Sequence, residues 1–286
     1  MTTQLNVALY GLGSMGYGMA QSFLRAGHTT YGFDVNTEAM ARFRVEGGAA
    51  GEVAQIAPDL DAVVVVVLNA AQAETVLFGP DGIVPHLKPG AVVICCPTVQ
   101  PDFARAMEAR CHTTGVHYLD APISGGAAKA AQGQLSIMAA GSDQAFEAAR
   151  PVLDACAATV FELGDQAGPG SAMKAVNQLL AGVHIAAMAE AVTFGMTQGI
   201  DPETFMKVIP QCAGTSWMLE NRAPHIVAGD YTPHSAVDIW PKDLGIVLDI
   251  ARGSKFGAPI AAAALQHVEA IAEIRGGDLN RLSLLC

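Results

Sequence analysis

The sequence is poor in positive charge and lacks the cysteine spacing of a metal site or a disulfide framework. Its 286 residues carry 16 Lys and Arg against 27 Asp and Glu, a net charge of −11. This balance argues against a nucleic-acid-binding protein. The six cysteines form no CxxC pair, so we expect buried, reduced thiols and no bound metal in a cytoplasmic protein. A few local Lys or Arg side chains would have to hold an anionic substrate.

The sequence also lacks a long uninterrupted apolar run, and we expect no signal peptide. No apolar run reaches the roughly 18 residues of a membrane-spanning helix. The start, MTTQLNVALYG, leads into a predicted strand without the basic region of a signal peptide. With 51% hydrophobic residues, the composition favours a well-buried globular protein without a membrane partner.

A glycine-rich turn, GLGSMG at 11–16, follows the apolar run 5–10 and precedes a stretch of helical spacing that ends near Gly27. A G-x-G-x-x-G turn between a strand and a helix is typical of dinucleotide binding. Gly11 permits the tight turn, Gly13 lets the backbone approach a pyrophosphate, and Gly16 lets the helix pack on the strand. Leu12 and Met15 belong to the same predicted cofactor-binding turn.

An acidic residue ends the next predicted strand. Asp34 follows the last glycine of the turn by 18 positions, where a carboxylate accepts hydrogen bonds from a ribose 2′-hydroxyl and repels a 2′-phosphate. The sequence therefore favours NAD over NADP.

Strands and helices continue to alternate, which predicts a doubly wound, Rossmann-type α/β domain. The β-branched run 62–68 ends at Leu68, where the carboxyl end of a strand would meet the cofactor. After the strand 91–95, Thr98 is expected to cap the helix 101–114, to contact the nicotinamide ribose, or both. The segments 135–141 and 159–164 are expected to complete the sheet.

A serine and two glycines follow another predicted strand end. Ser124, Gly125 and Gly126 offer a hydroxyl and bare backbone N–H groups, an arrangement that suits a carboxylate. An ordinary glycine turn is the alternative.

From Gly168 onward the pattern is helical, so we expect a dinucleotide-binding domain at 1–165 and an all-α domain at 166–286. A proline-free stretch of about 28 residues after Gly168-Pro169-Gly170 predicts one long, buried helix that joins the domains. Further helices are expected at 203–211, 216–228, 240–253 and 258–274.

Polar side chains in the first turns of the long helix need an explanation. Lys174, Asn177 and Gln178 fall on one helical face. Lys174 either pairs with a carboxylate or acts as a catalytic lysine in a cleft. His184 lies about 15 Å further along the axis, so it is interpreted as a core or interface residue. Lys242, in the first turn of a later helix, either pairs with a carboxylate such as Asp238 or faces the cleft.

Four separated motifs resemble those of the β-hydroxyacid dehydrogenase family. They are GLGSMG at 11–16, DAPISGG at 120–126, GPGSAMKAVNQ at 168–178 and KDLGIVLD at 242–249. The resemblance covers essentially the whole chain. It implies an enzyme that uses NAD to oxidise a CH–OH group of a small hydroxy acid.

The resemblance also implies residue roles. Lys174 becomes the catalytic acid/base, Asn177 orients the substrate, and Ser124, Gly125 and Gly126 bind its carboxylate. Gln178 joins the substrate-binding residues, and Thr98 and Lys242 contact the cofactor. A lysine at its reference pKa of about 10.4 is a poor base, so this role requires burial or a nearby cation such as Lys242.

Two departures from the family pattern mark a branch. One extra residue separates Gly164 from Gly168, and Gln178 replaces a frequent second Asn. With the segments 178–191 and 213–239, they resemble the L-threonate dehydrogenase branch, which oxidises the C2 hydroxyl. The alternatives are 3-hydroxyisobutyrate dehydrogenase, tartronate semialdehyde reductase, an imine reductase and a non-catalytic nucleotide-binding protein. The apolar helices further indicate a homo-oligomer, a dimer or tetramer.

Overall fold

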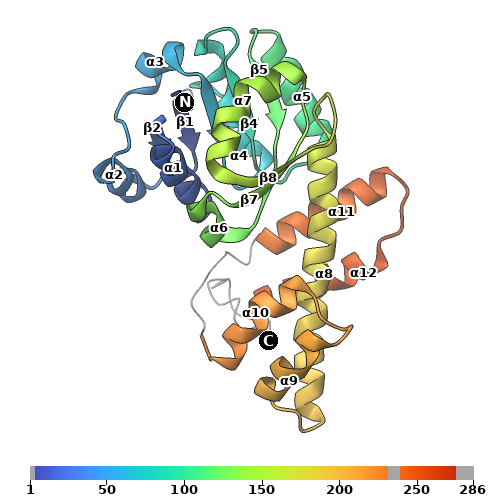
Figure 1. Ribbon diagram of the computed structural model, residues 1–286. Helices are drawn as coiled ribbons and strands as arrows, with labels where there is room; N and C mark the ends of the chain where they lie inside the picture. The colour runs from blue at the N-terminus through green and yellow to red at the C-terminus, as the bar shows by residue number, and fades with distance from the viewer. Residues whose placement is uncertain (1–3, 231–238, 275–286) are drawn as a thin grey trace. The chain divides into compact units, whose positions relative to one another are not determined.

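The computed structural model describes residues 4–230 and 239–274. The chain divides into two compact units, Met1–Lys174 and Ala175–Cys286, and each is described by itself (Figure 1). The predicted boundary at 165/166 lies earlier in the chain, before the long helix begins.

The first unit contains a five-stranded parallel sheet in the order β2-β1-β3-β4-β5. Its strands are β1 (Asn6–Tyr10), β2 (Thr29–Phe33), β3 (Ala62–Val65), β4 (Val92–Cys95) and β5 (His117–Asp120). The connecting helices are α1 (Gly16–Arg25), α2 (Thr37–Val45), α3 (Val53–Ile56), α4 (Ala70–Phe78) and α5 (Pro101–His112), with 3-10 turns at Ala57–Asp59 and Val84–His86. Val64 packs into one hydrophobic cluster and Val63 and Val65 into another. Both faces of the sheet are therefore covered, which confirms the doubly wound prediction.

The remaining strands of this unit form a second sheet, so the prediction that they complete the first one is wrong. β6 (Ile123–Ser124) pairs antiparallel with β7 (Leu135–Ala139), which pairs parallel with β8 (Ala157–Glu162). The helices α6 (Gly126–Gln132) and α7 (Asp143–Cys156) connect them. Pro122 has no N–H group to continue the ladder after β5, and an isolated bridge between Asp120 and Ala140 links the sheets.

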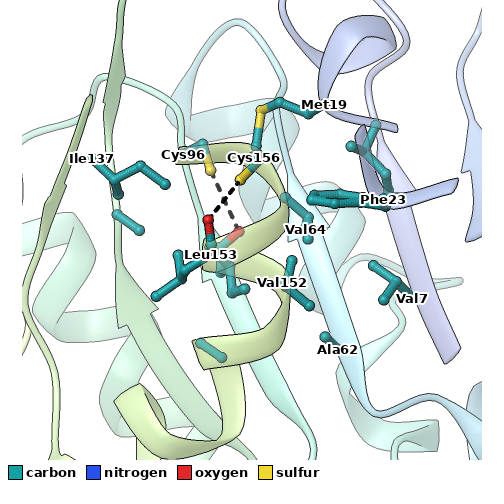
Figure 2. Close-up of a cluster of buried hydrophobic side chains, with 14 of the residues drawn as sticks. Val7, Met19, Phe23, Ala62, Val64, Cys96, Ile137, Val152, Leu153 and Cys156 are labelled. Carbon is teal, nitrogen blue, oxygen red and sulfur yellow. Dashed lines mark hydrogen bonds between the residues drawn. The ribbon is translucent and has the colours of Figure 1, made fainter. Parts of the chain in front are cut away.

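Buried thiols form part of the core of the first unit (Figure 2). Cys96 donates a weak hydrogen bond to the Ile94 carbonyl at 3.9 Å, and Cys156 donates one to the Leu153 carbonyl at 3.7 Å. Burial raises the pKa of Cys156 to about 12, which makes this thiol unreactive. The prediction of buried, free thiols is confirmed for Cys95, Cys96, Cys111 and Cys156, and it is wrong for the exposed Cys212. Cys286 lies outside the described residues.

The long helix α8 (Pro169–Thr197) begins in the first unit and continues into the second. The second unit also contains α9 (Pro202–Val208), a 3-10 turn (Ile209–Gln211), α10 (Trp217–Val227), α11 (Ile239–Gly253) and α12 (Pro259–Ile274). Asp201 and Ser216 cap α9 and α10 through their side chains. None of the described residues after Gly168 forms a strand, as predicted.

One face of α8 is exposed, which corrects the prediction that the helix is buried. Met173, Val176, Leu180 and Phe194 are 45%, 57%, 50% and 66% exposed. By length and composition α8 is also apolar enough to cross a membrane, with a mean hydropathy of 1.5 over 18 residues. This property was not predicted, because polar residues such as Lys174 and Asn177 interrupt the apolar runs of the helix. The core helix of a soluble protein has the same composition.

Candidate active site

The glycine turn after β1 leaves room for a ligand at one position. A Cβ atom on Gly11 would lie 2.4 Å from the Val66 carbonyl oxygen, and one on Gly16 would lie 1.8 Å from the Gly11 carbonyl oxygen. These glycines are therefore required by the fold. A Cβ on Gly13, in contrast, would meet nothing within 4 Å. The turn lies where β1 and β3 are neighbours and their connections diverge, the usual place for a dinucleotide.

The carboxylate of Asp34 is fixed beside this turn. Its Oδ2 accepts a hydrogen bond from the Leu12 amide at 2.6 Å, and its Oδ1 accepts one from the Asn36 amide at 2.7 Å. Met15 is the N-cap residue of α1, without a side-chain cap. No described side chain thus caps the N-terminus of α1, where an anionic group can bind, so the residues present fit a dinucleotide.

Two further predicted cofactor residues lie at strand ends. Leu68 follows β3, is 44% exposed and donates its amide to Gln72 Oε1 at 2.9 Å. Thr98 follows β4 and is buried. The expectation that Thr98 caps α5 is wrong, since Gln100 is the N-cap of that helix. Its contact with the cofactor stays a prediction.

The Ser124–Gly126 segment forms a backbone turn at the start of α6. Gly125 and Gly126 have φ values of 138° and 80°, which L-amino acids with side chains rarely adopt. A Cβ on Gly126 would meet nothing within 4 Å. Gly126 therefore leaves open space at the backbone, which an anion-binding turn needs, whereas a Cβ on Gly125 would lie 3.0 Å from the Lys129 side chain.

Lys174 is held at this turn. Its side chain is buried, with 8% exposure, and its Nζ donates a hydrogen bond to the Ile123 carbonyl at 2.8 Å. Ile123 immediately precedes Ser124. The structure thus brings together two parts of the chain that the sequence analysis singled out separately.

Two further residues, Asp120 and Ser171, were not predicted from the sequence. They connect the end of β5 to the start of α8, the helix that carries Lys174. Asp120 is 1% exposed, and it accepts hydrogen bonds from the Gly168 and Ser171 amides at 2.9 and 2.8 Å and from the Ser171 hydroxyl at 2.6 Å. Burial nevertheless raises the pKa of Asp120, although these hydrogen bonds lower it. Both residues lie inside the quoted motifs, but neither residue type stands out there.

In the second unit, a chain of contacts runs from Asn177 through Gln178 and the buried carboxylate of Asp243 to Lys242. Asn177 donates to Gln178 Oε1 at 2.8 Å, Gln178 Nε2 donates to Asp243 Oδ2, and Lys242 forms an ion pair with Asp243 at 2.7 Å. Asp243 is 2% exposed and was also missed. Lys242 thus pairs with a carboxylate, as one alternative expected. Asp238, which the sequence offers as a possible partner of Lys242, lies outside the described residues.

Comparison with known proteins decides the family. Residues 6–164 match the NAD binding domain of 6-phosphogluconate dehydrogenase, and residues 168–285 match the NAD-binding domain of NADP-dependent 3-hydroxyisobutyrate dehydrogenase. The chain belongs to the β-hydroxyacid dehydrogenase family. This family membership makes the chain an NAD-dependent hydroxyacid dehydrogenase, with NAD as its cofactor.

Individual members of the β-hydroxyacid dehydrogenase family are similar over most of this chain. The L-threonate dehydrogenase of Cupriavidus necator is 50% identical over 91% of this chain and 88% of its own length. That of Escherichia coli strain K12 is 47% identical over 92% of this chain and 88% of its own length. A solved structure described as 3-hydroxyisobutyrate dehydrogenase from Salmonella typhimurium is 45% identical, covers 99% of both chains and has a TM-score of 0.91. The fold prediction is thereby confirmed.

Proposed function

We propose that this chain oxidises the C2 hydroxyl of L-threonate to the 2-oxo acid with NAD⁺, and that Lys174 is the acid/base. The observation that carries the proposal is the position of Lys174 Nζ, 2.8 Å from the carbonyl that precedes Ser124. The substrate assignment is supported by relatives at 47–50% identity that are named L-threonate dehydrogenase.

Each predicted site residue has its own role in the proposed reaction. The hydroxyl of Ser124 and the backbone N–H groups of Gly125 and Gly126 hold the substrate carboxylate, which brings the adjacent C2 hydroxyl toward Lys174. Lys174 takes the hydroxyl proton during oxidation and returns it during reduction. Bound NAD⁺ supplies the hydride acceptor. Asn177, one turn further along α8, holds the hydroxyl oxygen, and its hydrogen bond to Gln178 fixes its carboxamide.

NAD is preferred over NADP in this proposal because of Asp34. A 2′-phosphate beside its carboxylate would place two anions together. The Leu12 and Asn36 amides hold that carboxylate at the end of β2, so it cannot easily turn away.

The exposed face of α8 supports a homo-oligomer. Met173, Val176 and Leu180 follow one another at helical spacing and are about half exposed. Apolar residues gathered on one helix face favour association with another copy. We further infer a cytoplasmic enzyme, because four of its cysteines are free and buried.

A second candidate, 3-hydroxyisobutyrate dehydrogenase, is favoured by the description of the Salmonella structure. Both substrates carry a carboxylate and a hydroxyl, so the same residues serve both. They differ in which carbon carries the reacting hydroxyl, and therefore in its distance from the carboxylate.

A substrate panel separates these candidates. NADH formation is followed by absorbance with L-threonate, D-erythronate, 3-hydroxyisobutyrate and D-glycerate, each with NAD⁺ and with NADP⁺. The proposal predicts the highest kcat/KM for L-threonate with NAD⁺. A higher value for 3-hydroxyisobutyrate would keep the dehydrogenase and overturn the substrate. Inactivity on all four substrates would contradict the proposed function.

A further inference from the structure

We propose that Asp120 and Ser171 are positioning residues, which set the place of the Lys174 amine by fixing the first turn of α8 to the end of β5. This inference rests on the proposed role of Lys174 as the acid/base. It concerns a pair of buried side chains that touch neither the turn after β1 nor the Ser124–Gly126 segment through any hydrogen bond described above.

Several hydrogen bonds attach the start of α8 to Asp120. Three donors from the start of α8, two amides and one hydroxyl, converge on the single carboxylate of Asp120. The beginning of a helix has unsatisfied N–H groups, and a carboxylate there is stabilising. Glu108 of α5 adds a second carboxylate, which accepts the Ala167 amide at 3.1 Å. The start of α8 is thus tied to the first unit at several points.

Ser171 and Lys174 are close together on α8. The two residues are three positions apart on α8, so they lie nearly one helical turn apart, about 4.5 Å along the axis. Asp120 and Ile123 are likewise three positions apart, at the end of β5 and the start of β6. The same short segment therefore holds α8 through Ser171 and holds the amine of Lys174 through the Ile123 carbonyl.

The junction between Asp120 and the start of α8 is closely packed. A Cβ on Gly170 would lie 2.6 Å from the Asp120 carbonyl oxygen and 2.5 Å from the Met138 carbonyl oxygen. Ser171 itself has no exposed surface. Because the first turn of α8 packs this closely, a small shift of the turn after loss of a hydrogen bond also moves Lys174, and misplacement by about 1 Å can lower a rate about 100-fold.

The test compares two buried serines. Ser171→Ala removes the hydroxyl bond to Asp120 and leaves both amide bonds. Ser22→Ala is the control, because Ser22 is 2% exposed in the same unit and its hydroxyl lies 3.0 Å from the Ala130 carbonyl and 3.1 Å from the Gly18 carbonyl. This hydroxyl also accepts a hydrogen bond from Arg25 at 2.7 Å, so the control removes at least as many contacts as Ser171→Ala. For both variants we would measure kcat, KM and the primary isotope effect with C2-deuterated L-threonate. A loss of folded protein lowers kcat without changing the isotope effect or KM.

A second readout does not need a substrate. The chain has six lysines, so ¹³Cε labelling with Lys174→Ala for assignment reports the surroundings of the Lys174 amine directly. We expect Ser171→Ala to lower kcat about 10-fold, to raise the isotope effect, to leave KM within twofold, and to shift the Lys174 resonance. Ser22→Ala should do none of these.

Each result decides the question. If Ser171→Ala equals Ser22→Ala in kcat and in the isotope effect, the positioning role is overturned. If the wild-type chain oxidises no substrate, the proposed function fails and the labelled lysine decides alone. A shifted Lys174 resonance in Ser171→Ala then supports the pair as positioning residues, and an unchanged one overturns it.

Discussion

A buried lysine amine needs a polar partner, because removing a charge from water costs several kcal/mol. Lys174 donates a hydrogen bond to one such partner, the Ile123 carbonyl. This hydrogen bond fixes the amine beside the residue that precedes Ser124, which fits the proposed role of Lys174 as the acid/base.

Only some of the residues at the candidate site could be predicted from the sequence. Lys174 and Ser124 were found because a lysine on an apolar helix and a hydroxyl before two glycines are unusual. Asp120, Ser171 and Asp243 were missed, because Asp and Ser are ordinary residues in turns and near helix starts. Their burial, which makes them notable, exists only in the folded chain.

Asp120→Asn should change the pH dependence of stability. Burial raises the pKa of Asp120 in the folded chain above its unfolded value of 3.8, so the folded state binds this proton more tightly. The contribution of Asp120 to the free energy of unfolding therefore falls as pH rises from about 3.8 through the raised folded pKa. Urea unfolding of both proteins between pH 3.5 and 7 measures the difference.

This pH range fixes the direction in which the difference between the two free energies of unfolding changes. The free energy of unfolding of Asp120→Asn minus that of the wild type should increase with pH, because the variant has no carboxylate to ionise. A difference that stays constant, or decreases, would show that the Asp120 pKa is not raised by burial.

At the scale of elements, the glycine turn after β1 was the most predictable feature. Its spacing, its flanking strand and helix, and Asp34 were all read from local sequence, and the structure places them as expected. The separation of β6, β7 and β8 into a second sheet was not readable. Pairing partners of short strands are fixed by contacts distant in sequence, and Pro122 gave the sole local sign of the break.

Gly13→Ala should weaken NAD binding, whereas Gly16→Ala should lower the stability of the fold. A Cβ on Gly13 meets nothing within 4 Å, whereas one on Gly16 lies 1.8 Å from the Gly11 carbonyl oxygen. Gly13→Ala should keep its thermal stability and weaken NAD binding about 10-fold or more, about 1.4 kcal/mol. Gly16→Ala should lose about 1–3 kcal/mol of stability.

Thermal unfolding and NAD titration of both variants check this contrast. Unchanged NAD affinity in a folded Gly13→Ala variant would contradict the placement of the pyrophosphate at this turn.

At the scale of the whole molecule, the two-part organisation was predictable because the sequence changes from alternating strand and helix patterns to helical patterns alone. The surface of α8 was not predictable. An apolar helix can be buried inside its own chain or against another copy, and composition does not distinguish these. The described residues of α8 leave Val176 57% exposed and Phe194 66% exposed.

Val176→Glu should reduce the oligomeric mass measured by sedimentation velocity, because a charge at a buried interface is costly. Val45→Glu is the matched control, since Val45 is 89% exposed on α2 and should leave the mass unchanged. Equal masses for the two variants would contradict an interface along this face of α8.

The most direct test of the central claim is kcat/KM for L-threonate with NAD⁺ in the wild type and in Lys174→Ala, measured beside the Kd for NAD. Lys88→Ala, at a partly buried ion pair with Asp61 outside the candidate site, is the control. We predict a loss of about 10²–10⁴-fold for Lys174→Ala, an unchanged Kd for NAD, and wild-type activity for Lys88→Ala. A Lys174→Ala enzyme that retains wild-type kcat/KM would contradict Lys174 as the acid/base.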